Sequence, residues 1–319
     1  MGEPKVVVIT INYNQDDYTI KCVKSILQSA YDNYDLLLID NGSLLMNYKQ
    51  LCNKLPDDEH LILRRLENNR GYVGGVNYGL REGMKLSPDY FLIMNNDTII
   101  DKHAIRSLVD TCKEYKNIAI VTGKVLSFHH PDIIQTTGTL LTNKNRIKGY
   151  YVGENEKDGG QYDHIEERDI VDDIFWLFHK QLIKTIGYYS DWFGFGYEQA
   201  DFALRAKKHG YKLIYTYKAK LWHFGNATVG KTNSPYKAFW SLQGYLIFRY
   251  LYQSKLFFFE TYLISWLVIF KALVNDFLSL FPHAFKKKYG MALFLSMLRF
   301  HFWLMFRISY TKFVPGFVK

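Results

Sequence analysis

Three apolar runs, each stopped abruptly by amide or carboxylate side chains, constrain this chain more than any other feature of its sequence. The runs are Lys5–Ile11, Leu36–Ile39 and Phe91–Met94. Apolar runs of this length without polar alternation are typical of strands that are buried on both faces of a parallel sheet. The sequence therefore predicts an α/β core in which helices cover both faces of such a sheet.

Helical periodicity appears between the strand-like runs, and this alternation is typical of doubly wound folds. Residues 126–170 are polar and lack clear periodicity, so we expect short strands and loops there, along one side of the crevice. The other predicted elements are helices over Tyr18–Ser29, Ala104–Tyr115 and Gln199–Lys208, and strands over Leu61–Leu66, Ile118–Val125 and Lys212–Tyr217.

Polar side chains follow the apolar runs at the point where each predicted strand ends. Asn12 and Tyr13 follow the first run, Asp40 follows the second, and Asn95, Asn96 and Asp97 follow the third. The carboxyl ends of parallel strands form the ligand-binding edge of an open α/β sheet. There, Asp97 can hold a divalent cation against a diphosphate, Asp40 can bind a base or ribose, and Tyr13 can stack on a base. The structural alternatives are turns for the polar residues and core packing for the tyrosine.

A glycine-rich stretch, Asn69–Gly79, is expected to run into a helix. Its spacing differs from the G-x-G-x-x-G of dinucleotide-binding folds, and the sequence contains no G-x-x-x-x-G-K-[S/T] phosphate loop. We expect its glycines, with Gly71 and Gly74 foremost, to allow close backbone approach to a nucleotide beside the amide donors of a helix N-terminus.

Two later segments carry groups suited to catalysis. The glycine-rich segment Trp192–Arg205 delivers Glu198 to the start of a helix, with Asp201 one turn later. A carboxylate there can act as general base toward an acceptor hydroxyl, or can simply stabilise the positive end of the helix dipole. His223 lies in the loop Trp222–Lys231 and can complete a metal site with Asp97, although a lone histidine is more often structural.

The chain from Gly244 to Lys319 differs in composition from the rest. It carries ten Lys and Arg residues, two acidic residues and 22 of the 54 aromatic residues, so it accounts for +8 of the net charge of +9. The basic charge therefore describes this tail, and no nucleic-acid partner is expected. Aromatic segments with cationic flanks favour a helix in an anionic membrane interface over a full span. A bundle packed on the main domain, or an oligomer interface, is the alternative.

Taken in order, these motifs resemble the inverting glycosyltransferases of family 2, and most closely a rhamnosyltransferase-like branch that builds bacterial surface polysaccharides. The motifs are N-Y-N, D-N-G-S, N-x-G-Y-x-G-G-x-N, N-N-D-T, Y-E-x-x-D-x-x-x-R and W-H-x-x-x-x-T-x-G. Thr137-Gly138 and Gly159-Gly160-Gln161-Tyr162 are similar to loop landmarks of that branch, and the resemblance spans about Val6 to Phe248. It implies a GT-A fold, a mostly parallel Rossmann-like sheet flanked by helices, with a nucleotide diphosphate-sugar donor and Mg²⁺ or Mn²⁺.

By position in the resemblance, Asp40 would contact the base, and Asp97 and His223 the metal. The implied nucleotide-sugar site comprises Asn12, Tyr13, Asp40, Gly71, Gly74, Asn77, Asn95, Asn96 and Lys231. The family often has Glu-Asp where this chain has Glu198-Gln199, so Glu198 is the expected base and Asp201 the reserve. The chain also departs from the family at Asp173–Trp176, where small residues are common, and this changes the expected shape of the acceptor pocket.

The resemblance and the tail together imply a metal-dependent, inverting, non-processive enzyme. It would move one sugar from dTDP-rhamnose or a UDP-hexose to a lipid-linked saccharide. We expect a catalytic domain over residues 1–243, with a donor half of about 1–125 and an acceptor half of about 126–243, followed by the tail over 244–319. Three cysteines without metal-ligand spacing and the lack of a signal-peptide pattern favour the cytoplasmic face of the membrane. A sugar nucleotidyltransferase and a non-catalytic sugar- or membrane-binding scaffold remain the alternatives.

Overall fold

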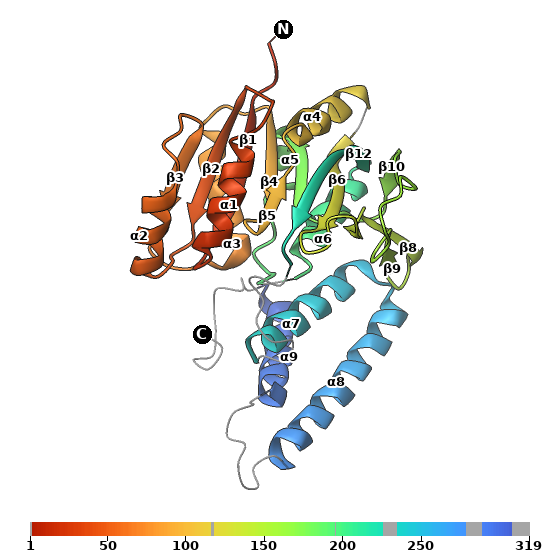
Figure 1. Ribbon diagram of the computed structural model, residues 1–319. Helices are drawn as coiled ribbons and strands as arrows, with labels where there is room; N and C mark the ends of the chain where they lie inside the picture. Colours follow the sequence, from red (N-terminus) through yellow and green to blue (C-terminus); the bar gives the residue numbers. More distant parts are fainter. Residues whose placement is uncertain (1, 116–117, 195, 226–234, 279–288, 308–319) are drawn as a thin grey trace. The chain divides into compact units, whose positions relative to one another are not determined.

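The computed structural model describes residues 2–115, 118–194, 196–225, 235–278 and 289–307 (Figure 1). The chain forms two compact units. The first comprises Met1–Leu140, Tyr150–Tyr189 and Phe202–Ala227, and the second comprises Leu141–Gly149, Ser190–Asp201 and Thr228–Lys319. The boundary expected at residue 243 lies inside a helix of the second unit, and the segment that contains Glu198 also belongs to that unit.

A ten-stranded sheet forms the centre of the first unit, in the order β10-β12-β6-β11-β4-β1-β2-β3, with β5 and β7 paired to β12 and β6. The strands β3, β2, β1 and β4 are parallel to one another, β12 is parallel to β6, and β11 lies antiparallel between β4 and β6. The bounds are β1 (Val6–Asn12), β2 (Tyr34–Asp40), β3 (Leu61–Arg65), β4 (Tyr90–Met94), β5 (Thr98–Ile100), β6 (Ile118–Ser127), β7 (Ile134–Thr136), β10 (Ile165–Arg168), β11 (Phe175–His179) and β12 (Lys212–His223). A separate hairpin is formed by β8 (Thr139–Asn143) and β9 (Lys148–Tyr151).

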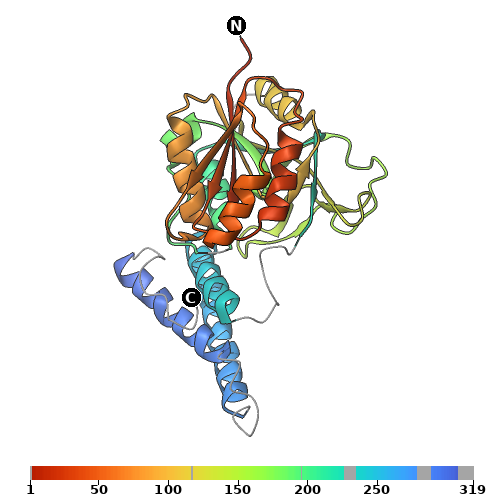
Figure 2. The same ribbon diagram turned by 60° about the vertical axis from the view of Figure 1, so that its left-hand side comes forward.

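Helices cover both faces of the sheet, as the apolar runs predict. They are α1 (Asp16–Ile26), α2 (Leu45–Lys54), α3 (Gly71–Met84), α4 (Ala104–Glu114), α5 (Gln181–Ile186) and α6 (Glu198–Lys208). Val8, Leu38 and Leu92 share one core cluster with buried residues of α1, α2 and α4, and Figure 2 shows α1 and α2 side by side on that face. Ile9 points the opposite way, toward α3. Alternate strand residues thus serve opposite layers, which explains why the runs are continuously apolar.

The glycine-rich stretch runs into a helix as predicted, and that helix, α3, already begins at Gly71. Gly75 and Gly79 lie one turn apart on the face of α3 that packs on β1. A Cβ atom at Gly79 would lie 2.7 Å from Cγ2 of Ile9, and one at Gly75 would lie 3.0 Å from Cγ2 of Ile11. The missing side chains let α3 approach the sheet closely, which outweighs the low helix propensity of glycine.

The other predicted helices and strands are present, most with ends shifted by up to three residues and one with a larger difference in length. The strand expected over Lys212–Tyr217 continues to His223, because its second half pairs with the end of β6 and with β5. A register shift between Thr216 and Lys220 separates the two halves. This longer strand carries His223 to the edge at which β4 ends, where it pairs with Thr98.

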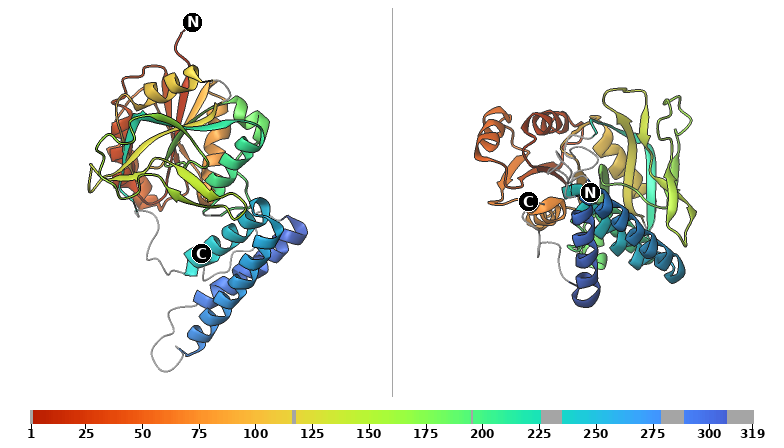
Figure 3. Two further views of the ribbon diagram at one scale, coloured as in Figure 1. Left: turned by 90° about the vertical axis from the view of Figure 1, so that its right-hand side faces the viewer. Right: turned by 90° about the horizontal axis from the view of Figure 1, so that it is seen from below.

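The described helices of the second unit are α7 (Pro235–Tyr252), α8 (Lys255–Leu278) and α9 (Tyr289–Phe306). Helices α8 and α9 run side by side in opposite directions (Figure 3), and α9 also packs on α7. Helices α8 and α9 approach closely at Gly290, which has no side chain. A Cβ atom there would lie only 2.6 Å from the backbone of Ala272. The carboxylate of Asp276 accepts hydrogen bonds from the backbone amides of Gly290 and Met291 and so caps α9.

Both α8 and α9 are long and apolar enough to cross a membrane, judged by length and composition. They differ in burial: 11% of the apolar window of α8 is buried, compared with 44% for α9. The exposed apolar residues of α8, called here the α8 face, are Leu256, Phe259, Leu263, Ile264, Leu267, Val268, Phe270, Val274 and Phe277. An exposed apolar face of this extent marks an interaction surface for a membrane or another protein.

Candidate functional site

A continuous network of buried polar side chains joins the carboxyl ends of β1, β2 and β4. Nδ2 of Asn12 donates to Oδ1 of Asp40 at 2.9 Å, and the two residues are paired in the parallel register. Oγ1 of Thr19 donates to Oδ1 of Asn12, and Nδ2 of Asn96 donates to the same Thr19 oxygen, both at 2.8 Å. The structure therefore brings Asn12, Asp40 and Asn96 together as predicted, and Thr19, which the sequence analysis missed, is the link between them.

Asp97 and His223 meet at the same edge of the sheet. Nε2 of His223 lies 3.1 Å from Oδ1 of Asp97, and the backbone amide of Phe224 donates to the Asp97 carbonyl oxygen. The other ring nitrogen, Nδ1, lies 3.0 Å from Oε1 of Gln135 in β7. No sequence signal marked Gln135, because its position depends on the pairing of β7 with β6.

The chemistry of this pair fits a divalent cation. The amide oxygen of Gln135 can accept a hydrogen bond from Nδ1 of His223, and in that tautomer Nε2 presents a lone pair to the Asp97 carboxylate. A lone pair and a carboxylate oxygen repel unless a proton or a metal ion lies between them, and a second hydrogen bond of this kind orients many metal-bound histidines. Among the described residues there is no group of three or more His, Cys, Asp or Glu side chains suited to a metal. A cation here would therefore need ligand oxygens from a diphosphate and water.

The start of α3 is fixed beside the end of β2. Asn41 accepts a hydrogen bond from the amide of Arg70 and donates through Nδ2 to Asn69 Oδ1 and to the Gly71 carbonyl. Gly71 has φ of +69°, a conformation that favours glycine. The first turn of α3, which includes Gly74, thus begins close to the polar network, while Tyr13 is exposed after β1.

A second buried cluster lies where β11 begins. The side-chain amide of Asn77 is used fully by the backbone of Tyr189, donating to its carbonyl and accepting from its amide. The phenols of Tyr189 and Tyr72 both donate to Oδ2 of Asp173, at 3.1 and 2.8 Å. Burial raises the pKa of Asp173 to about 7, while these two hydrogen bonds act in the opposite direction.

Glu198 and Asp201 lie in the first turn of α6, in the part assigned to the second unit. Both are buried, but their surroundings differ. Asp201 accepts a hydrogen bond from Ser190 on Oδ2 and one from the Tyr252 phenol on Oδ1, both at 2.7 Å. Both Asp201 oxygens therefore accept hydrogen bonds that hold segments of the unit together. Lys231, predicted for the donor site, lies outside the described residues.

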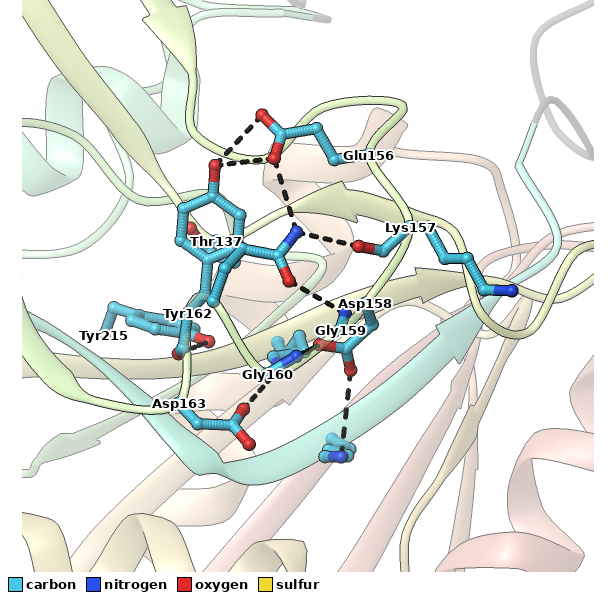
Figure 4. Close-up of polar contacts among 12 residues, drawn as sticks. Thr137, Glu156, Lys157, Asp158, Gly159, Gly160, Tyr162, Asp163 and Tyr215 are labelled. Carbon is cyan, nitrogen blue, oxygen red and sulfur yellow. Dashed lines mark hydrogen bonds and ion pairs between the residues drawn. The ribbon is translucent and has the colours of Figure 1, made fainter.

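The landmark loop Gly159–Tyr162 is flanked by two aspartates that form ion pairs with a buried lysine, and Figure 4 shows the polar contacts around it. Nζ of Lys124, which is completely buried, lies 2.6 Å from Asp158 and 2.7 Å from Asp163. Although burial acts to raise the pKa of Asp158, the hydrogen bond and charge of Lys124 hold that pKa below its usual value. The Tyr215 phenol donates to the Tyr162 carbonyl. These contacts give the loop a structural anchor on β6 and β12.

Comparison with known proteins identifies relatives of this fold. Residues 7–175 match the family described as Glycosyl transferase family 2. The poly-beta-1,6-N-acetyl-D-glucosamine synthase of Staphylococcus aureus (strain MSSA476) is 24% identical over 235 residues, which covers 68% of this chain and 49% of that protein. Glycosyltransferase GlyA of Streptococcus pneumoniae serotype 4 is 26% identical over 130 residues, or 41% of this chain and 18% of that protein.

A solved structure shares the architecture. The crystal structure of GalNAc-T7 with UDP, GalNAc and Mn²⁺ superposes with a TM-score of 0.56 at 14% identity, and the match covers 77% of this chain and 48% of that one. This confirms the predicted mixed α/β fold of GT-A type. The chain spans about half the length of the S. aureus synthase that it matches.

Proposed function

Because the chain belongs to glycosyl transferase family 2, we propose that it transfers a sugar from a nucleotide diphosphate-sugar to a hydroxyl group of a saccharide during polysaccharide synthesis. The observation that carries this proposal is the Asp97–His223 pair, which lies at the carboxyl edge of the sheet with the Asp40–Asn12–Thr19–Asn96 network. Two relatives of the chain are named as a polysaccharide synthase and a glycosyltransferase, which supports the proposal. A GT-A structure that contains UDP and Mn²⁺ supports the same donor class.

In the proposed complex, the strand-end residues hold the nucleotide. Asp40, which is oriented by Asn12 and approached by Nε of Arg65 at 3.5 Å, accepts hydrogen bonds from the base or ribose. The exposed ring of Tyr13 stacks on the base. Gly71 and Gly74 bring backbone amides of α3 near the diphosphate, with Asn95, Asn96 and Lys231 completing the donor site. Asn77 acts indirectly, by fixing Tyr189.

Asp97 and His223 would hold Mg²⁺ or Mn²⁺, which supplies positive charge to the departing diphosphate. Glu198 removes the proton from the acceptor hydroxyl as its oxygen attacks the anomeric carbon from the side opposite the diphosphate. The new glycosidic bond forms as the bond to the diphosphate oxygen breaks, so the anomeric configuration is inverted. We assign this chemistry to residues 1–243, with the donor bound by about 1–125 and the acceptor by about 126–243.

Transfer of one sugar and processive synthesis differ in their products. The similarity to a named polymer synthase favours repeated transfer. The sequence has no Q-x-x-R-W-type motif, which favours a single transfer, from dTDP-rhamnose or a UDP-hexose to a lipid-linked saccharide. The mass of the product decides between them, because a processive enzyme gives a ladder of products and a non-processive one gives a single addition.

A donor screen tests the proposal at low cost. With Mg²⁺ or Mn²⁺ present, one nucleotide-sugar at 100-fold excess over its Kd is expected to raise Tm by about 5 °C. The panel contains dTDP-rhamnose, UDP-glucose and UDP-N-acetylglucosamine. EDTA should remove most of the shift, because Asp97 and His223 would hold a cation whose charge stabilises the bound diphosphate. A full panel without any cation-dependent shift would exclude the donor class.

The α8 face is proposed to lie in the interface of an anionic membrane, at its cytoplasmic side, where a lipid-linked acceptor is found. The chain from residue 244 onward carries +8 of the net charge of +9, which complements anionic headgroups. Apolar residues of α8 are exposed along the whole helix. An interfacial helix buries such a face among the lipid chains while its cationic residues contact the headgroups.

The double variant Leu263→Glu/Leu267→Glu is expected to lower flotation with phosphatidylglycerol vesicles by about tenfold or more, because charges replace two exposed leucines that the proposal places among the lipid chains. Gln50→Glu/Asn53→Glu, which adds the same charge to exposed positions of α2, should float like the unmodified protein. Undiminished flotation of the α8 variant would contradict the proposal. A change from dimer to monomer, seen by light scattering, would instead assign the α8 face to an oligomer interface.

A further inference from the structure

Asp173 occupies an unusual position for a carboxylate. It lies two residues before β11, whose first residue, Phe175, pairs with Met94 at the end of β4. The amide of Asn95 donates to the carbonyl of the intervening residue, Ile174, at 3.0 Å. Asp173 is therefore one residue away from the backbone of the strand-end segment Asn95–Asp97. A carboxylate here borders the proposed donor site and comes from a different segment, the turn before β11, than the proposed metal ligands.

The carboxylate is oriented by two phenols, and the residue's own backbone amide also donates to it. Tyr72 and Tyr189 both donate to Oδ2, and no described Lys or Arg residue forms an ion pair with Asp173. Within the described part of the chain, no side chain donates to the second carboxylate oxygen, Oδ1. A buried carboxylate without a cationic partner is costly unless its lone pairs are satisfied by hydrogen bonds. The two oxygens thus differ: Oδ2 is held by both phenols, whereas Oδ1 has no side-chain donor among the described residues.

The two tyrosines are themselves fixed to the proposed donor site. Tyr72 follows Gly71 in the first turn of α3, and the backbone of Tyr189 is clamped by the Asn77 amide at 2.9 and 3.0 Å. Such support is what a recognition group needs, since it keeps the carboxylate in one orientation before a ligand arrives. A carboxylate oxygen held in this way is well suited to accept a hydrogen bond from a sugar hydroxyl.

We propose that Asp173 recognises the transferred sugar, with Oδ1 accepting a hydrogen bond from a hydroxyl of that sugar and Tyr72 and Tyr189 acting as positioning residues. The inference rests on the proposed function and deepens it, because it names the side chain that distinguishes a nucleotide-sugar from the free nucleotide. A site that hydrogen-bonds a hydroxyl also discriminates strongly against a sugar that lacks it. Asp173 thereby becomes a determinant of donor choice.

The test compares the affinities of nucleotide-sugars with those of the nucleotides alone. Calorimetry with Mn²⁺ gives Kd for UDP-glucose, UDP-N-acetylglucosamine and UDP, and for dTDP-rhamnose and dTDP. In Asp173→Asn, the affinity for the preferred nucleotide-sugar should fall about 10- to 100-fold, the range for a hydrogen bond to a charged group. The affinity for UDP or dTDP should change less than twofold. Tyr189→Phe, which keeps the carboxylate, should show a smaller loss with the same selectivity.

The possible outcomes separate the two claims. If the unmodified protein binds no nucleotide-sugar, the proposed function and this inference fail together. If it binds one and Asp173→Asn lowers the affinities for sugar nucleotide and free nucleotide equally, Asp173 only supports the structure and this inference alone fails. Asp173→Ser, a smaller neutral replacement, gives a second measurement if the asparagine variant does not fold. A selective loss in either folded variant supports the assignment.

Discussion

Asp97→Asn is expected to lower kcat/KM for sugar transfer by at least about 100-fold and to remove the effect of Mg²⁺ or Mn²⁺ on donor binding. The substitution keeps the shape of the side chain but removes the negative charge that would hold the cation. Asp97 is buried, and its Oδ1 lies 3.1 Å from Nε2 of His223. Among the described residues, no second carboxylate forms a metal-binding group with this pair that could take over the role of Asp97. Isothermal titration of the donor with and without Mn²⁺ measures the effect.

Asp110→Asn is the matched control, because Asp110 is an exposed carboxylate on α4. It should leave donor binding and turnover unchanged. His223→Gln should weaken cation-dependent binding less than Asp97→Asn, since it removes a neutral ligand and keeps the charge. If donor binding by Asp97→Asn depended on Mg²⁺ or Mn²⁺ as strongly as in the unmodified protein, the cation would be bound elsewhere.

Glu198→Gln is expected to lower kcat by about 10²- to 10⁴-fold, the usual contribution of a general base. Donor affinity should remain within about twofold, because the proposed nucleotide contacts come from other elements. The amide keeps the size of the side chain and cannot accept the proton of the acceptor hydroxyl. Single-turnover kinetics with saturating donor separates this chemical step from binding.

Asp201→Asn is the informative comparison for Glu198→Gln, since both residues lie in the first turn of α6. Asp201 holds Ser190 and Tyr252, so its replacement should lower Tm and leave kcat largely intact under conditions in which the protein stays folded. The opposite pattern, with turnover lost in Asp201→Asn and kept in Glu198→Gln, would transfer the catalytic role to Asp201.

The fold was predictable to the extent that it depends on local pattern. Continuous apolar runs identified β1, β2 and β4, and the polar residues after them identified the ligand-binding edge of the sheet. A second role of the α3 glycines could not be predicted, because it is set by a partner: Gly75 and Gly79 permit contact with Ile11 and Ile9, which no local pattern encodes.

The supporting residues of the site were not predictable for the same reason. Thr19 joins Asn12 to Asn96 only because α1 packs beside the strand ends, and Gln135 reaches His223 only because β7 pairs with β6. The sequence marked Asp173 only as a departure from the family. Its position beside Asn95 and between two tyrosines became evident from the pairing of β11 with β4.

The most direct test of the central claim is turnover of a nucleotide-sugar by the purified full chain. The reaction contains Mn²⁺, each donor of the panel and a lipid-linked saccharide extract from a polysaccharide-producing bacterium. Release of the nucleoside diphosphate is measured together with the mass of the extended acceptor. The account predicts equal amounts of nucleoside diphosphate and acceptor extended by one sugar, both lost in Asp97→Asn. Absence of nucleoside diphosphate release with every donor, together with unchanged nucleotide binding by Asp97→Asn, would contradict it.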